Sequence, residues 1–214
     1  NPEYFAVLKN GKRSTDPNEQ HPGQLCLSNP QLRKEILEDA KSALRGEPAS
    51  KRGVVLSKYG TSMWTPSGYY PGFFNVMPQD GFQPCQCPDC QKYFAAGNGT
   101  ELIWEMTAEI ASAIQEASIP GYITQMGYDF YARIPKVSLP DNVLVMYATM
   151  GPWGKSNPGM QNKAREEIQG WCRKIQKKVW LWNYMINDSR WPGHQAGPKG
   201  VPHFTPRTAG KYFQ

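Results

Sequence analysis

The chain has 214 residues, of which 24 are Lys or Arg and 18 are Asp or Glu, so its net charge with neutral histidines is +6. Hydrophobic residues make up 39% and aromatic residues 12%, which is enough apolar surface for a folded core and excludes wholesale disorder. No apolar run reaches the roughly 18 to 20 residues that a transmembrane helix needs, so we expect no membrane span. The length predicts one domain or most of one.

The basic residues are spread along the chain, and their one local cluster, Arg173-Lys174 with Lys177-Lys178, falls on a predicted helix. A solvated helix face explains such a cluster better than a nucleic-acid site, so we expect no nucleic-acid partner. Gly-rich phosphate loops, Gly-x-Ser-x-Gly elbows and His-Glu-x-x-His motifs are absent, which argues against nucleotide-binding, serine-hydrolase and zinc-protease functions.

Three amphipathic helices are predicted. The first begins at Pro30, with Ser28 or Asn29 as its cap, and ends before Gly46. The second follows a cap at Asn98 or Thr100 and stops at Pro120-Gly121, and the third spans roughly 161–177.

Short apolar segments between these helices read as strands. A minor candidate is 54–56, and the main ones are 73–77, 122–128, 142–148 and 179–184. Continuous apolar strands that alternate with helices indicate a parallel α/β sheet. Four strands are too few for an eight-stranded barrel. We therefore expect residues 1–214 to form the central part of one TIM-type (β/α) barrel, with a loop insertion at 53–71 and a loop-rich tail at 188–214.

Several stretches together resemble one family, the bacterial domain of unknown function numbered 4838. They are Asn1-Pro2-Glu3-Tyr4-Phe5 with Gly11-Lys12-Arg13, Gln24-Leu25-Cys26-Leu27-Ser28-Asn29-Pro30, Gln79-Asp80-Gly81 leading into Cys85-Gln86-Cys87-Pro88-Asp89-Cys90, Asp141-Asn142-Val143, and Trp182-Asn183-Tyr184.

The resemblance covers most of residues 1–192 and implies a glycoside hydrolase-type barrel, similar to α-glucuronidases and β-hexosaminidases, in an exported protein of polysaccharide-degrading bacteria. It implies that the chain starts after the third barrel strand and stops after the seventh, so that the rest of the barrel belongs to a longer parent chain. The expected location is secreted or periplasmic. The 53–71 insertion departs from the family pattern, as does Asn183, because the family often has Trp-Asp-Tyr where this chain has Trp-Asn-Tyr.

Carboxylates beside the strand ends are the candidate catalytic groups. Asp80 follows the strand 73–77, and barrel enzymes place their chemistry at the carboxyl ends of strands. The alternative is that Asp80 only caps the turn before Gly81. Asp188 is a candidate for the second carboxylate, whereas Asp129 has no spacing that singles it out. We expect no cofactor for catalysis.

Aromatic side chains can stack on sugar rings, and amides can bind sugar hydroxyls. The alternative for Trp180 and Trp182 is a place in the core. Two functions stay open: a glycoside hydrolase that acts on polysaccharide or oligosaccharide, and a non-catalytic carbohydrate-binding or scaffold barrel. The candidate substrate-binding residues are Tyr128, Trp182, Asn183, Tyr184, Trp64 and Trp153.

Five cysteines leave at least one thiol unpaired, and Cys85, Cys87 and Cys90 crowd into one loop. The resemblance places Cys26 at the start of the preceding helix and makes it the fourth member of this cluster. Four thiolates suit a structural Zn²⁺, whereas an exported chain favours disulfides, and free buried thiols are the third option. Cys172 lies on the inward stripe of its helix and is expected to be buried.

Overall fold

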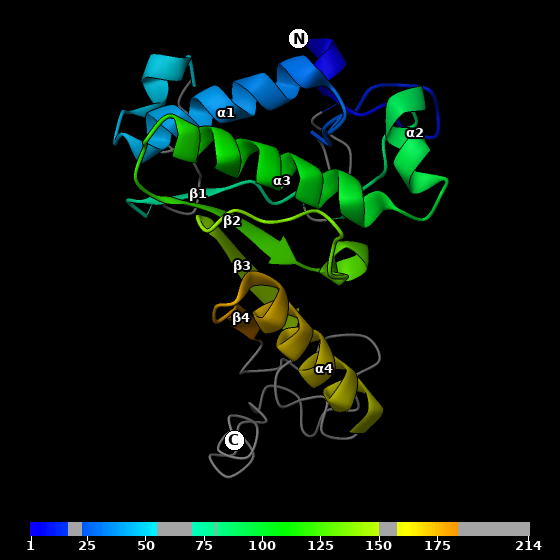
Figure 1. The fold of residues 1–214 in the computed structure, drawn as a ribbon. Coiled ribbons are helices and arrows are strands. Elements are labelled where there is room, and N and C mark those ends of the chain that lie inside the picture. Colours follow the sequence, from blue (N-terminus) through cyan, green and yellow to red (C-terminus); the bar gives the residue numbers. More distant parts are fainter. Residues whose placement is uncertain (17–22, 55–69, 80, 150–157, 184–214) are drawn as a thin grey trace, which may run out of the picture. The chain divides into compact units, whose positions relative to one another are not determined.

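The computed structural model describes residues 1–16, 23–54, 70–79, 81–149 and 158–183. Helices alternate with strands along these residues, as in an α/β fold (Figure 1). Short 3₁₀ helices occupy Pro2–Tyr4, Ala49–Arg52 and Asp129–Ala132. The α-helices are α1 (Pro30–Leu44), α2 (Pro88–Phe94), α3 (Gly99–Glu116) and α4 (Pro158–Ile175), and the strands are β1 (Phe73–Asn75), β2 (Tyr122–Gly127), β3 (Val143–Thr149) and β4 (Trp180–Asn183).

The four strands form one sheet in the order β1-β2-β3-β4, which is also their order in the chain. β1 pairs in parallel with β2, with Phe73 opposite Tyr122, and β3 pairs in parallel with β4, with Met146 opposite Trp180. The predicted α/β class and parallel sheet are confirmed. The sheet of the described residues is open, so it is not a closed barrel.

Two compact units divide the chain, residues 1–145 and residues 146–214. In the first unit, α3 packs against both α1 and β2 (Figure 1). Contact with both partners explains why α3 is apolar around most of its circumference rather than along one stripe. Its largest fully buried side chains are Leu102, Ile103, Trp104, Met106, Ile110 and Ile114.

The start of α1 follows from its sequence. The Asn29 side chain accepts hydrogen bonds from the backbone N–H groups of Gln31 and Leu32, and Pro30 occupies the first helical turn. Asn29 rather than Ser28 is therefore the cap. The helix α2 was not predicted, because its seven residues are too few to show a helical period.

The second unit contains β3 from Met146 onward, α4 and β4. Trp171 and Ile175 of α4 are buried, and the Tyr147 hydroxyl of β3 donates a hydrogen bond to Glu167 of α4. Cys172 is only partly buried, so the prediction of a buried thiol is wrong. Cys172 neighbours the buried stripe of α4 without belonging to it. The strand candidate 54–56 is not seen: Val54 lies in no element, and 55 and 56 fall outside the described residues.

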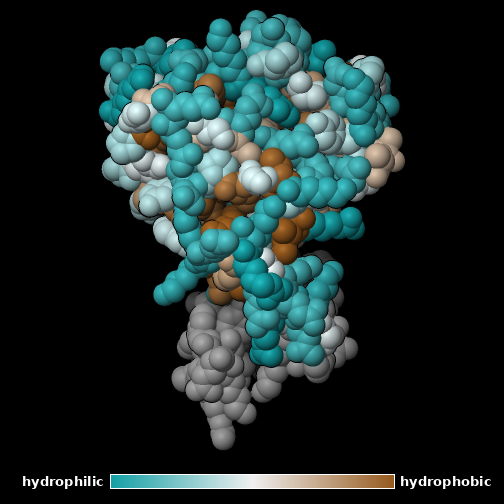
Figure 2. Space-filling view, in the orientation of Figure 1, coloured by the Kyte–Doolittle hydropathy of each residue, from teal (hydrophilic) through white to brown (hydrophobic). Residues whose placement is uncertain are grey.

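Hydrophilic residues cover most of the first unit on the face drawn in Figure 2, and hydrophobic residues gather toward the middle of that face. Among the described helices, none is long and apolar enough to cross a lipid bilayer.

Candidate functional site

Four cysteine sulfurs from two distant parts of the chain meet in the first unit. Cys26 lies shortly before α1, Cys85 and Cys87 precede α2, and Cys90 lies in the first turn of α2. The Cys26 Sγ lies 3.6 Å from the Cys87 Sγ and 4.0 Å from the Cys90 Sγ, and all four Sγ atoms lie within 4.8 Å of one another. The structure thus brings Cys26 together with the three loop cysteines.

Polar hydrogens surround these sulfurs. The Cys85 Sγ accepts hydrogen bonds from the backbone N–H of Val7 at 3.2 Å and of Cys87 at 3.5 Å. The Cys87 Sγ caps α2 by accepting from the Cys90 N–H at 3.5 Å. The Ser28 hydroxyl oxygen lies 3.0 Å from the Cys90 Sγ. Donors of this kind favour an ionised sulfur.

The cluster is shielded from solvent, since the exposed fraction is 1% for Cys85 and Cys90 and 5% for Cys26. Hydrogen bonds from Cys26 and Cys90 lower the pKa of the Cys85 thiol. The hydrogen bond with Cys85 raises the pKa of Cys26 to about 11, and those with Cys26 and Cys85 raise the pKa of Cys90. These hydrogen bonds favour a thiolate at Cys85 over one at Cys26 or Cys90. All five cysteines are free.

Backbone hydrogen bonds hold the N-terminal segment against the cysteine loop. The Gln86 N–H donates to the Val7 carbonyl at 2.8 Å, and the Cys26 N–H donates to the Tyr4 carbonyl at 2.8 Å. An antiparallel bridge joins Phe5 to Leu25. The cluster thus lies where the N-terminal residues, the turn before α1 and the loop before α2 converge.

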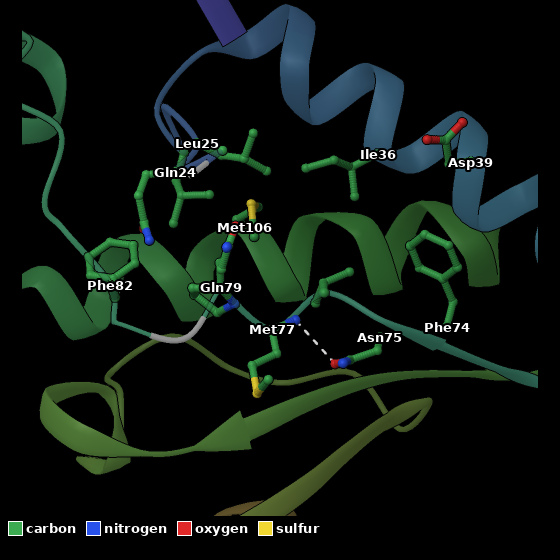
Figure 3. A pocket seen from close by; sticks show the side chains of 14 residues that line it. Gln24, Leu25, Ile36, Asp39, Phe74, Asn75, Met77, Gln79, Phe82 and Met106 are labelled. Atoms are coloured by element: carbon green, nitrogen blue, oxygen red, sulfur yellow. Dashed lines mark hydrogen bonds between the residues drawn. The ribbon is translucent and has the colours of Figure 1, made fainter. Parts of the chain in front are cut away.

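A cavity of about 280 Å³ lies at the carboxyl end of β1 (Figure 3). Its lining comes from α1, from α3 through Met106, from Gln24 and its neighbours, from residues 74–79 and from Phe82. The Asn75 side-chain oxygen accepts a hydrogen bond from the Met77 N–H at 3.1 Å across one wall. Asp80, the first candidate catalytic residue, follows Gln79 and lies outside the described residues.

Two candidate sugar-binding aromatics are exposed at the carboxyl ends of strands. Tyr128 directly follows β2 and is 42% exposed, and Trp182 lies near the end of β4 and is 48% exposed. Asn183, the last residue of β4, is partly buried. Trp180 and Trp182 are both exposed, so neither belongs to the core of the described residues. The remaining candidates, Tyr184, Asp188, Trp64 and Trp153, lie outside the described residues.

Asp129 is a carboxylate that no spacing in the sequence singles out. It is exposed, directly follows Tyr128, and has a left-handed backbone with φ of +49°. Asp adopts this conformation more readily than most residues, and such positions concentrate at functional sites. Its position right after a predicted strand is the signal that could have identified it, by the same argument that selected Asp80.

One family model matches this chain, that of the domain of unknown function DUF4838, over residues 70–192. The match runs from just before β1 to beyond β4 and includes Cys85, Cys87 and Cys90, whereas Cys26 precedes it. No curated protein and no solved structure matches the chain. Because the match covers more than half of the chain, the protein belongs to the DUF4838 family.

Proposed function

We propose that this protein is a glycoside hydrolase-like member of its family that binds polysaccharide or oligosaccharide at the carboxyl ends of its parallel strands. The observation that carries the proposal is the exposure of Tyr128 and Trp182 at the ends of β2 and β4. Exposed rings of this kind stack on the apolar faces of sugars. The net charge of +6 would attract acidic sugars such as uronic acids. An exported bacterial protein, secreted or periplasmic, fits this role.

The strand order supports a barrel-type architecture. Right-handed connections between sequential parallel neighbours place every connecting helix on the same face of a sheet. A doubly wound sheet needs a reversal of strand order to cover both faces, and the order β1-β2-β3-β4 has none. We therefore propose that these strands form part of a (β/α) barrel completed by other strands of a parent chain. Barrel enzymes carry their sites at the carboxyl ends of the strands.

The hydrolysis of a glycosidic bond needs two carboxyl groups, one to protonate the leaving oxygen and one to act as a base or nucleophile. Asp80 is the proposed acid, because in the sequence it directly follows Gln79, which lines the 280 Å³ cavity. Asp129 joins Asp188 as a candidate for the second carboxylate. Asn183 cannot take up a proton at neutral pH and is proposed to orient substrate or water.

Asn183 also favours a second candidate function, a carbohydrate-binding or scaffold barrel without catalysis. The resembled family often has a carboxylate at this position at the end of β4. An amide there can still hydrogen-bond to sugar hydroxyls, but it cannot transfer a proton.

Binding is tested by calorimetry against a panel of plant, algal and bacterial oligosaccharides, with and without uronic acids. Tyr128→Ala should weaken binding at least tenfold. Tyr122→Ala is the matched control, because Tyr122 is equally exposed at 42% but begins β2, about 20 Å away along the strand. Trp182→Ala and Trp180→Ala form a second pair on β4. Equal losses in both members of each pair would contradict a site at the carboxyl ends.

Catalysis is tested by reducing-sugar release from the same panel. Asp80→Asn and Asp129→Asn should each abolish release while binding persists. Release that survives both substitutions would refute these assignments. Binding without any release from the unmodified protein would favour the non-catalytic function.

A further inference from the structure

We propose that Cys26, Cys85, Cys87 and Cys90 form a structural zinc site that joins the segment before α1 to α2. The site is separate from the strand ends that carry the proposed function. The zinc proposal therefore does not depend on that function.

The sulfur positions match a single tetrahedral ion. A Zn–S bond of about 2.3 Å gives a distance of about 3.8 Å between any two sulfurs of a regular tetrahedron. The Cys26 Sγ lies 3.6 Å and 4.0 Å from two of its partners, and no pair among the four exceeds 4.8 Å. Small shifts of side chains would therefore place all four sulfurs around one cation. Iron–sulfur clusters spread their cysteines over several irons and hold them farther apart than one tetrahedron does.

Four sulfur ligands define both the preferred metal and its role. Thiolates favour Zn²⁺ over Mg²⁺ and Ca²⁺, which prefer oxygen ligands. Four protein ligands also leave no position for water or substrate, so the site is structural rather than catalytic.

The surroundings of the cluster suit the charge of such a centre. Binding releases the four thiol protons, because only thiolates ligate zinc, and leaves a tetrathiolate complex with a net charge of −2. The backbone N–H groups of Val7 and Cys87 already point at the Cys85 Sγ, and the Ser28 hydroxyl lies 3.0 Å from the Cys90 Sγ. These donors offset negative charge on the sulfurs and orient them, as outer partners do in protein metal sites.

The site links parts of the chain that are far apart in sequence. Cys26 and Cys90 are separated by 64 residues, and the residues between them include α1 and β1. An ion that binds the folded arrangement and not the unfolded chain stabilises the fold in proportion to its affinity. The N-terminal segment, which contacts the cysteine loop through Val7, would be held in place by the same ion.

The test begins with metal analysis of the protein purified without chelator. We expect one zinc per chain and no reactive thiol other than Cys172 until a strong chelator is added. Chelation should lower the melting temperature by several degrees, and added zinc should restore it. Cobalt added to the zinc-free protein should give the visible bands of tetrahedral Co²⁺ and a near-ultraviolet thiolate-to-cobalt band.

Matched variants assign the ligands. Cys87→Ser alters the least buried of the four cysteines and should lose the zinc, whereas Cys172→Ser should retain it. If Cys87→Ser does not fold, the cobalt spectrum of the unmodified protein shows whether a tetrahedral thiolate site exists. Disulfides within the cluster, bound iron in place of zinc, or four titratable thiols in a folded metal-free protein would each overturn the proposal.

Discussion

The side-chain oxygen of Gln24 accepts a hydrogen bond at 3.2 Å from the backbone N–H of Gln83, a residue 59 positions away. The Gln24 amide nitrogen donates to the Gly81 carbonyl at 3.4 Å, and the Gln24 backbone carbonyl accepts from the Ala6 N–H. Gln24 is 1% exposed. The buried Gln24 side chain thus links the loop between β1 and α2 to the N-terminal segment by hydrogen bonds.

Replacing Gln24 by Ala should therefore destabilise the protein by about 1–3 kcal/mol, since it removes a buried side chain together with its hydrogen bonds to Gln83 and Gly81. Urea denaturation monitored by circular dichroism measures the loss. Gln31→Ala, on the exposed face of α1, is the matched control and should change stability by less than about 0.5 kcal/mol. Equal stability of the two variants would show that the loop does not depend on Gln24.

Gly121, which begins the turn into β2, should not tolerate a side chain. Its φ is +133°, and an added Cβ would lie 2.6 Å from a Leu44 methyl carbon and 3.0 Å from the Gly72 carbonyl oxygen. Gly121→Ala should therefore lower the melting temperature. Gly11→Ala separates the two causes, because Gly11 also has a positive φ but has open space around it. Gly11→Ala should cost only the backbone strain, about 1–2 kcal/mol, and Gly121→Ala should cost more. A smaller loss at Gly121 would contradict the contact with Gly72.

A pH-dependent contact joins α2 to α3. The Tyr93 hydroxyl donates to the Glu105 carboxylate at 2.7 Å, and this hydrogen bond raises the pKa of Tyr93. A tyrosine with a raised pKa in the folded state stabilises the fold fully below its unfolded pKa near 10, and the contribution is lost as the pH rises through the folded value.

Tyr93→Phe should cost about 1 kcal/mol at pH 7, since the contact is partly exposed. The difference between this variant and the unmodified protein should shrink above about pH 10. Denaturant midpoints between neutral and alkaline pH measure it, with Tyr70→Phe at an exposed position as the control. A difference that stays constant across this range would exclude the hydrogen bond as its source.

The indole of Trp104 donates from Nε1 to the Tyr131 carbonyl at 2.9 Å, and its side chain is completely buried. Trp104→Phe should destabilise the protein by about 2–4 kcal/mol, since it opens a cavity and removes the hydrogen bond to the Tyr131 carbonyl. Differential scanning calorimetry measures the shift. Phe73→Leu, at a half-buried position in β1, should shift the transition far less. A comparable shift would contradict a special role for Trp104.

Local patterns in the sequence determined where most helices and strands lie. α1 was predicted to within one residue at each end, because its cap, its first proline and Gly46 after its end are local signals. The four main strands were predicted to within two residues at each end. The helical periodicity did not reveal α2, because this helix has only seven residues. Its N-terminus is capped by the Cys87 sulfur, which accepts a hydrogen bond from the Cys90 N–H.

Tertiary structure decided the order of the strands, the exposure of Trp182 and the meeting of Cys26 with Cys90. The same β-branched and aromatic residues suit a buried or an exposed strand, so the sequence left the position of Trp182 open. The sequence also placed the cysteines in two separate segments. Only the packing of the N-terminal segment against the loop before α2 brings their sulfurs within 4.8 Å, because contacts across some 60 residues depend on the whole chain and not on local preference.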